Sequence, residues 1–175
     1  MDTRKIIMIA IAISITFVQE QMLLFLPNVQ FTVLLIIIFS SVFSLKESLV
    51  YILGYVLLDN MYLGGFNLFY MIPMLLAWSL IPITYHTILR KTTNEYYLGV
   101  FAFVFGFVYG WMFIPFNMIQ TGITNLIPYI TADILFEVIM AITGLLTVIW
   151  LYQPLMSVLK SLENTGRFSS RKIYK

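Results

Sequence analysis

Six stretches of mostly apolar residues follow one another along the chain, separated by short polar or turn-forming breaks. They cover residues 6–25, 31–45, 48–63, 68–89, 97–116 and 127–152. A helix that crosses a bilayer needs about 20 such residues, so the pattern predicts an all-α integral membrane protein with about six transmembrane helices. The second and third stretches are short for a full crossing, and the polar trio Gln19, Glu20 and Gln21 interrupts the first.

Composition agrees with this interpretation. Of the 175 residues, 61% are apolar and only 10% are charged, which leaves too little polar surface to cover a water-soluble globule. We therefore expect a single membrane-embedded domain over residues 1–175. Arg4 and Lys5 precede an apolar run without a small-residue cleavage site, so the first stretch reads as an uncleaved span rather than a signal peptide.

The basic residues indicate an orientation. If the N-terminus lies in the cytoplasm, all ten Lys and Arg residues fall on the cytoplasmic side, as the positive-inside rule requires. They are Arg4, Lys5, Lys46, Arg90, Lys91, Lys160, Arg167, Arg171, Lys172 and Lys175. Both termini are thus predicted to be cytoplasmic. Residues 160–175 form a basic tail, for which an anchor on anionic lipid is favoured over a specific docking role.

The acidic residues are distributed differently. Asp2, Glu47, Glu95 and Glu163 lie among the bases, whereas Glu20, Asp59, Asp133 and Glu137 fall in or near the outer half of the spans, without a Lys or Arg. An ionisable side chain at membrane depth is costly unless it faces water, a cavity or a partner. Four of them on one side predict a polar cavity that opens outward.

Asp133 and Glu137 are four residues apart, which places both carboxylates on one face of a helix. We predict that they converge with Asp59 and Asn60 on a bound molecule. Two alternatives remain open. The carboxyls can be protonated and bonded to neighbouring helices as structural contacts, and Asp59 and Asn60 can simply cap the third span.

Aromatic and amide side chains surround these carboxylates in the outer segments. Flat rings and amide groups suit a small-molecule pocket, although for any single Tyr or Trp an interfacial belt is the favoured interpretation. The predicted binding set adds Asn67, Tyr70, Trp78, Asn117 and Gln120.

Catalytic and energising motifs are missing. The chain lacks the phosphate loop of an ATPase, an H-E-x-x-H metal motif, a G-x-S-x-G nucleophile elbow and any cysteine. The single histidine, His86, lies beside Arg90 and Lys91, where a headgroup or solvent contact is favoured over catalysis. We expect no enzyme activity, no catalytic residue, no metal site and no cofactor.

Small residues recur four apart in two stretches, as in closely packed membrane helices. Gly106 and Gly110 form one pair, for which ordinary internal packing is the default interpretation. Ala10 and Ser14 form the other, in the first stretch.

Two further segments resemble a known family. The run P-N-V-Q-F-T at 27–32 and the run L-L-D-N at 57–60, followed by Gly64, Gly65 and Asn67, resemble the substrate-binding S components of energy-coupling factor (ECF) vitamin transporters. The resemblance implies six helices, a vitamin site on the outer side, and assembly with a scaffold (T) subunit and two ATPase subunits in a bacterial plasma membrane. It also implies that Ala10 and Ser14 dock to the scaffold, with Ser14 in place of the usual second alanine.

The charge pattern restricts the substrate. A carboxylate such as biotin, pantothenate or folate is expected to meet an Arg or Lys, and the outer segments contain none. A cationic or neutral ligand fits better, with cobalamin-like or queuosine-like compounds ranked ahead of thiamine-like ones from similarity to that branch of the family. Two other functions stay open: a non-transporting assembly or scaffold protein whose buried carboxylates are structural, and, more remotely, a small membrane enzyme.

Overall fold

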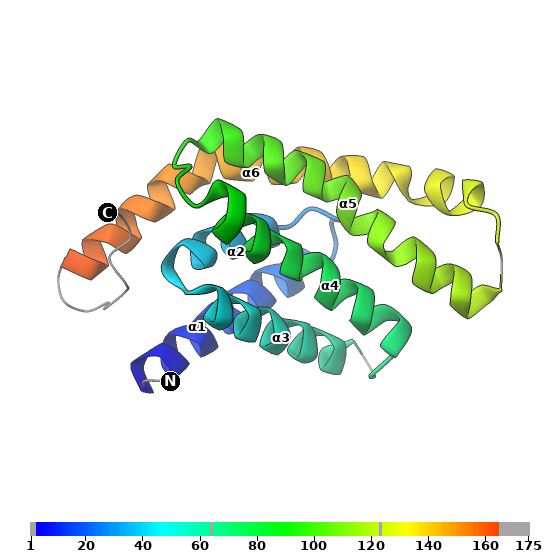
Figure 1. The fold of residues 1–175 in the computed structure, drawn as a ribbon, viewed down its shortest axis with the longest axis horizontal. Helices are drawn as coiled ribbons and strands as arrows, with labels where there is room; N and C mark the ends of the chain where they lie inside the picture. Colours follow the sequence, from blue (N-terminus) through cyan, green and yellow to red (C-terminus); the bar gives the residue numbers. More distant parts are fainter. Residues whose placement is uncertain (1–2, 64, 123, 165–175) are drawn as a thin grey trace.

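The computed structural model describes residues 3–63, 65–122 and 124–164, and within these ranges its regular structure is entirely helical (Figure 1). The helices are α1 (Thr3–Met22), α2 (Thr32–Val42), α3 (Leu45–Tyr62), α4 (Leu68–Thr84), the π-helical turn η1 (Tyr85–Leu89), α5 (Glu95–Thr121) and α6 (Ile127–Asn164). Each predicted apolar stretch corresponds, within a few residues, to one helix or, for residues 68–89, to α4 and η1 together. The predicted all-α fold is confirmed for these residues.

Four helical segments are long and apolar enough to cross a membrane: Thr3–Met22, Leu68–Leu89, Glu95–Thr121 and Ile127–Ser161. Helix α2 has 11 residues and is therefore ~16 Å long, about half of a 30 Å hydrocarbon core. Helix α3 has 18 residues but includes Lys46, Glu47 and Asp59. The chain thus has the helices of a membrane-embedded protein, whereas six crossings remain a prediction.

Helix α2 lies at the centre of the bundle. Nine of its residues are buried, and it contacts α1, α3, α4, η1 and α6. A helix that is apolar on every side is stable only when neighbours surround it. The start of α2 is held by Gln19 of α1, which accepts a hydrogen bond from the Phe31 backbone N–H (2.9 Å) and donates one to the Thr32 hydroxyl (2.8 Å).

The basic segments gather at one end of the bundle. In Figure 1 the start of α1, the α2–α3 turn, the η1–α5 turn and the end of α6 all lie on the left. The Lys5 ammonium contacts the Glu47 carboxylate at 2.5 Å, which joins the first turns of α1 and α3. The described bases therefore share one end of the bundle, as the charge pattern predicts. That this end faces the cytoplasm remains a prediction. Asp2, Arg167, Arg171, Lys172 and Lys175 lie outside the described residues.

Helices α5 and α6 form the most extensive helix pair, and glycines permit their close approach. A Cβ added at Gly106 would lie 2.6 Å from the backbone Cα of Ala141, and one added at Gly144 would lie 3.2 Å from the carbonyl oxygen of Ala102. Gly106 thus has the packing role expected of its G-x-x-x-G motif. Helix α6 continues to Asn164, so the predicted tail begins within a helix, and residues 165–175 lie outside the described part of the chain.

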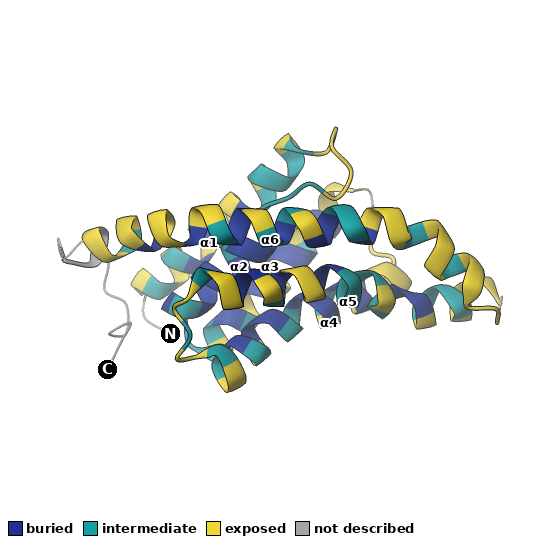
Figure 2. Ribbon diagram, turned by 90° about the horizontal axis from the view of Figure 1, so that it is seen from above, coloured by how far each residue is buried: buried dark blue, intermediate teal, exposed yellow. Residues whose placement is uncertain are grey.

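Large apolar side chains cover much of the outer surface. Figure 2 shows exposed residues along the outer faces of α5 and α6 and buried residues where the helices meet. Ile7, Ile11 and Val18 of α1, Val104 of α5 and Trp150 of α6 are all more than half exposed. Such a continuous apolar exterior suits contact with lipid rather than water.

Replacement of Gly106 by Ala is expected to destabilise the protein by about 1–3 kcal/mol, because the new methyl group meets the α6 backbone, which cannot rotate away. The midpoint of thermal unfolding in detergent measures the effect. Gly99→Ala on the same helix is the matched control, since its Cβ meets only side-chain atoms of Ile149 and Leu145. Equal effects of the two substitutions would contradict this account of the α5–α6 contact.

Candidate functional site

Asp133 and Glu137 lie one turn apart in the N-terminal half of α6. The helix is continuous through both positions, so the two carboxylates share a face as predicted. Asp133 is partly exposed, whereas Glu137 is 3% exposed. Neither carboxylate oxygen of Glu137 has a hydrogen-bond partner of normal geometry among the described residues. The Trp111 indole is nonetheless close enough to act as a donor toward this carboxylate, and the Asp133 carboxylate is its nearest like charge.

Gly110 of α5 makes room for the Glu137 carboxylate. A Cβ added at Gly110 would lie 2.8 Å from Glu137 Cγ and would also collide with the carboxyl group. The second glycine of the G-x-x-x-G motif therefore accommodates a side chain rather than a backbone. Ordinary helix packing accounts for Gly106 but only partly for Gly110.

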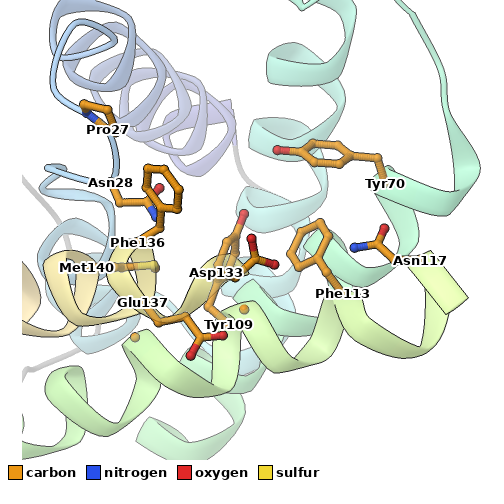
Figure 3. Close-up of a pocket in the computed structure, with 12 residues that line it drawn as sticks. Pro27, Asn28, Tyr70, Tyr109, Phe113, Asn117, Asp133, Phe136, Glu137 and Met140 are labelled. Carbon is orange, nitrogen blue, oxygen red and sulfur yellow. The ribbon is translucent and has the colours of Figure 1, made fainter. Parts of the chain in front are cut away.

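These residues line a cleft of about 380 Å³, which we call the acidic cleft. It lies between α5, α6, the start of α4 and the segment that joins α1 to α2 (Figure 3). The lining residues are Pro27, Asn28, Tyr70, Gly106, Tyr109, Gly110, Phe113, Asn117, Asp133, Phe136, Glu137 and Met140. The set contains two carboxylates, two amides and four aromatic rings, and it contains no Lys, Arg or His.

Aromatic rings form a continuous wall of the acidic cleft. The centroid of Phe113 lies 5.2 Å from that of Tyr70 and 5.1 Å from that of Tyr109. Behind them, the fully buried Trp78 packs on Tyr109 at a centroid distance of 4.6 Å. Rings held by their neighbours in this way offer flat apolar faces to a ligand at little cost in side-chain entropy.

The structure brings together four of the nine predicted binding residues, namely Tyr70, Asn117, Asp133 and Glu137, in the acidic cleft. Asn60 and Asn67, again with Tyr70, line an adjoining hollow of about 410 Å³ at the α3–α4 turn. The Tyr70 side chain lines both spaces. Trp78 lies in the core behind the cleft, and Gln120 is exposed near the end of α5.

Asp59 and Asn60 make contacts within the helix bundle. Asp59 accepts a hydrogen bond from the Gln21 amide (3.2 Å), and the Asn60 amide donates to the Val56 carbonyl oxygen (2.8 Å). Glu20, the remaining outer acid, accepts a hydrogen bond from the Tyr55 hydroxyl. The polar trio at 19–21 therefore joins α1 to the start of α2 and to α3, instead of interrupting the first helix.

Sequence reasoning did not identify several of the residues that line the acidic cleft. Tyr109, Phe113, Phe136 and Met140 look like ordinary apolar positions of a span, and only the fold directs them to the cleft. Asn28 belongs to the P-N-V-Q-F-T run singled out in the sequence, and in the structure it adopts φ 59°, a backbone conformation that asparagine tolerates better than most residues.

Comparison with known proteins adds no relative. No family model matches the chain, and no curated protein or solved structure is significantly similar to it. The function of the acidic cleft has to follow from its own residues.

The contact between Gly110 and Glu137 can be tested with a double-mutant cycle. Gly110→Ala is expected to lower the thermal midpoint in the wild-type background, because the methyl group displaces the buried carboxylate. The same substitution in a Glu137→Ala background is expected to be neutral or stabilising, since the space is then free. A coupling energy of about 1–3 kcal/mol between the two positions is expected, and strictly additive effects would contradict this geometry.

Proposed function

We propose that this chain is the substrate-binding and translocating subunit of an ECF-type ABC importer, which captures a vitamin or related micronutrient of neutral or cationic character. The observation that carries the proposal is the acidic cleft. It combines two carboxylates with aromatic walls, lacks any base, and is built from the helix ends opposite those that hold the described Lys and Arg residues. Small-molecule sites combine apolar walls with a few convergent polar groups in this way.

In the proposed arrangement α2 and α3 complete six crossings, with both termini in the cytoplasm. The basic end of the bundle then faces inward, as the positive-inside rule favours. The acidic cleft correspondingly opens to the outside of a bacterial plasma membrane, so that the direction of capture is inward.

The size of the cleft bears on the choice of ligand. About 380 Å³ is near the lower end of small-molecule sites, which span roughly 300–1,000 Å³. Within the proposed ligand range, this volume favours a compact ring compound, queuosine-like or thiamine-like, over a corrinoid.

Energy in this proposal comes from partner subunits, a scaffold and two ATPases, because the chain has no nucleotide-binding motif. The outer face of α1 supports such docking. Ala10 and Ser14 are both exposed, and the Ser14 hydroxyl donates to the Ala10 carbonyl oxygen (2.9 Å). The hydroxyl is thus satisfied within its own helix, which leaves a small surface for close helix contact.

A second candidate function is a non-transporting membrane assembly protein. The bonds of Glu20 to Tyr55 and of Asp59 to Gln21 favour it, since they show that two outer carboxyls join α1 to α3. The acidic cleft has no role in that alternative.

A ligand panel distinguishes the two functions. The purified protein is heated in detergent with thiamine, a queuosine precursor or cobalamin, and with biotin and pantothenate as anionic controls. A ligand that binds only the folded state adds about 2.7 kcal/mol of stability at 100 times its Kd, so one neutral or cationic compound is expected to raise the midpoint clearly. An unchanged thermal midpoint with every compound, together with no co-purifying ATPase, would contradict the proposed transport function.

Docking is tested by enlarging the small face of α1. Ala10→Trp and Ser14→Trp are expected to abolish co-purification with the scaffold and ATPase subunits while ligand-induced stabilisation persists. Ile15→Trp is the control, because Ile15 is exposed but turned about 100° further round the helix than Ser14. Intact assembly of the Ala10 and Ser14 variants would reject this face.

A further inference from the structure

Asp59 and Glu137 are the buried acids of the described structure, and they differ in whether the carboxylate has a hydrogen bond of normal geometry. Glu47 meets Lys5, Glu95 accepts a hydrogen bond from Gln153, and Asp59 accepts one from Gln21. Glu137 is 3% exposed, yet both of its oxygens lack a hydrogen bond of normal geometry. An unsatisfied buried acceptor is costly, and a charged one more so, so a protein that keeps it needs a partner from elsewhere.

The position of this carboxylate is built into the helix pair. The missing side chain of Gly110 opens the space in which it lies, and the Asp133 side chain joins it from one turn away in the same cleft. Because both carboxylates line the acidic cleft, a molecule in the cleft is placed to supply the hydrogen bonds of normal geometry that Glu137 lacks.

The lining of the cleft restricts what that partner can be. Two carboxylates without a base attract positive charge and N–H donors and repel anions. Tyr109 and Phe113 present aromatic faces, which suit a flat ring and attract a cation. An inorganic ion fits less well, because the described residues contain no group of three or more His, Cys, Asp or Glu side chains able to hold a metal.

We infer that the ligand of the acidic cleft is a planar organic cation, an amidinium or protonated amino-heterocycle, whose N–H groups bind Glu137 while its ring packs on Tyr109 and Phe113. This deepens the proposed function, since it requires the cleft to be a ligand site. It does not require the scaffold or the ATPase subunits.

Three small probes of nearly the same shape test the inference on the wild-type protein in detergent. Benzamidine is a cation, benzamide is its neutral counterpart, and benzoate is the anion. Benzamidine is expected to raise the thermal midpoint and to bind at least ten times more tightly than benzamide in equilibrium dialysis, while benzoate has no effect. Equal binding of benzamidine and benzamide, preference for benzoate, or no benzamidine binding would overturn the inference.

Glu137→Gln removes the charge and keeps the size of the side chain. It is expected to weaken benzamidine binding at least tenfold and to leave benzamide unaffected. Glu20→Gln and Glu95→Gln are the matched controls, because neither residue lines the cleft, and both are expected to bind benzamidine like the wild type. Undiminished benzamidine binding by the Glu137→Gln protein would overturn the assignment of this residue.

Gly110→Ala provides a second variant, which keeps the carboxylate but displaces it. It is expected to weaken benzamidine binding in the wild-type background and to have no further effect in the Glu137→Gln background. Additive losses would contradict a role for Gly110 in positioning the carboxylate.

Calcium chloride is the probe for an inorganic cation, and stabilisation by calcium that excludes benzamidine would overturn the inference in favour of a metal site. Failure of the inference is distinguishable from failure of the proposed function. Cation-selective binding of benzamidine, with no shift by any compound of the vitamin panel and no co-purifying ATPase, would uphold the inference and reject the transport function. Assembly and ligand uptake with equal binding of benzamidine and benzamide would uphold the transport function and reject the inference.

Discussion

Helix α2 has to be enclosed, and the arrangement of the other helices follows from that constraint. Eight of its eleven residues are apolar and nine are buried, because α1, α3, α4, η1 and α6 all pack against it. An irregular segment, residues 23–31, connects this short helix to α1. The Gln19 side chain accepts a hydrogen bond from the Phe31 backbone N–H, where α2 begins. That segment contributes Pro27 and Asn28 to the acidic cleft, so the burial of α2 and the construction of the site are linked.

Polar side chains within the apolar body fall into two groups. Gln19, Glu20 and Gln21 are paired with α2 or α3, and these bonds hold α1 in place, since an unpaired polar group in such surroundings is costly. Glu137 belongs to the other group, because it is more deeply buried than these three but lacks a hydrogen bond of normal geometry. This contrast separates acids that hold helices together from an acid that lines the acidic cleft without such a bond.

Glycine connects the packing of α5 and α6 to the chemistry of the cleft. Within one G-x-x-x-G motif, Gly106 admits the backbone of α6 and Gly110 admits the carboxylate of Glu137. The same close approach that stabilises the helix pair therefore also positions the carboxylate. Aromatic residues spaced along α5 complete the wall on that side, with Trp78 of α4 behind them.

Sequence alone determined the helical class, the approximate bounds of the helices, the grouping of described bases at one end and the shared face of Asp133 and Glu137. These features depend on local periodicity, on breaks in the chain and on the number of times it turns back. The tertiary structure decided which polar residues meet. The sequence could not distinguish Asp59, Asn60 and Trp78 from Asn117. Side-chain direction and helix rotation place Asp59 and Trp78 within the bundle and Asn117 at the acidic cleft, whereas the buried Asn60 borders the adjoining hollow. Sequence reasoning did not identify Tyr109 and Phe113 as cleft residues. An aromatic residue in a core and one that lines a cleft have the same sequence pattern, and only the packing of neighbouring helices distinguishes them.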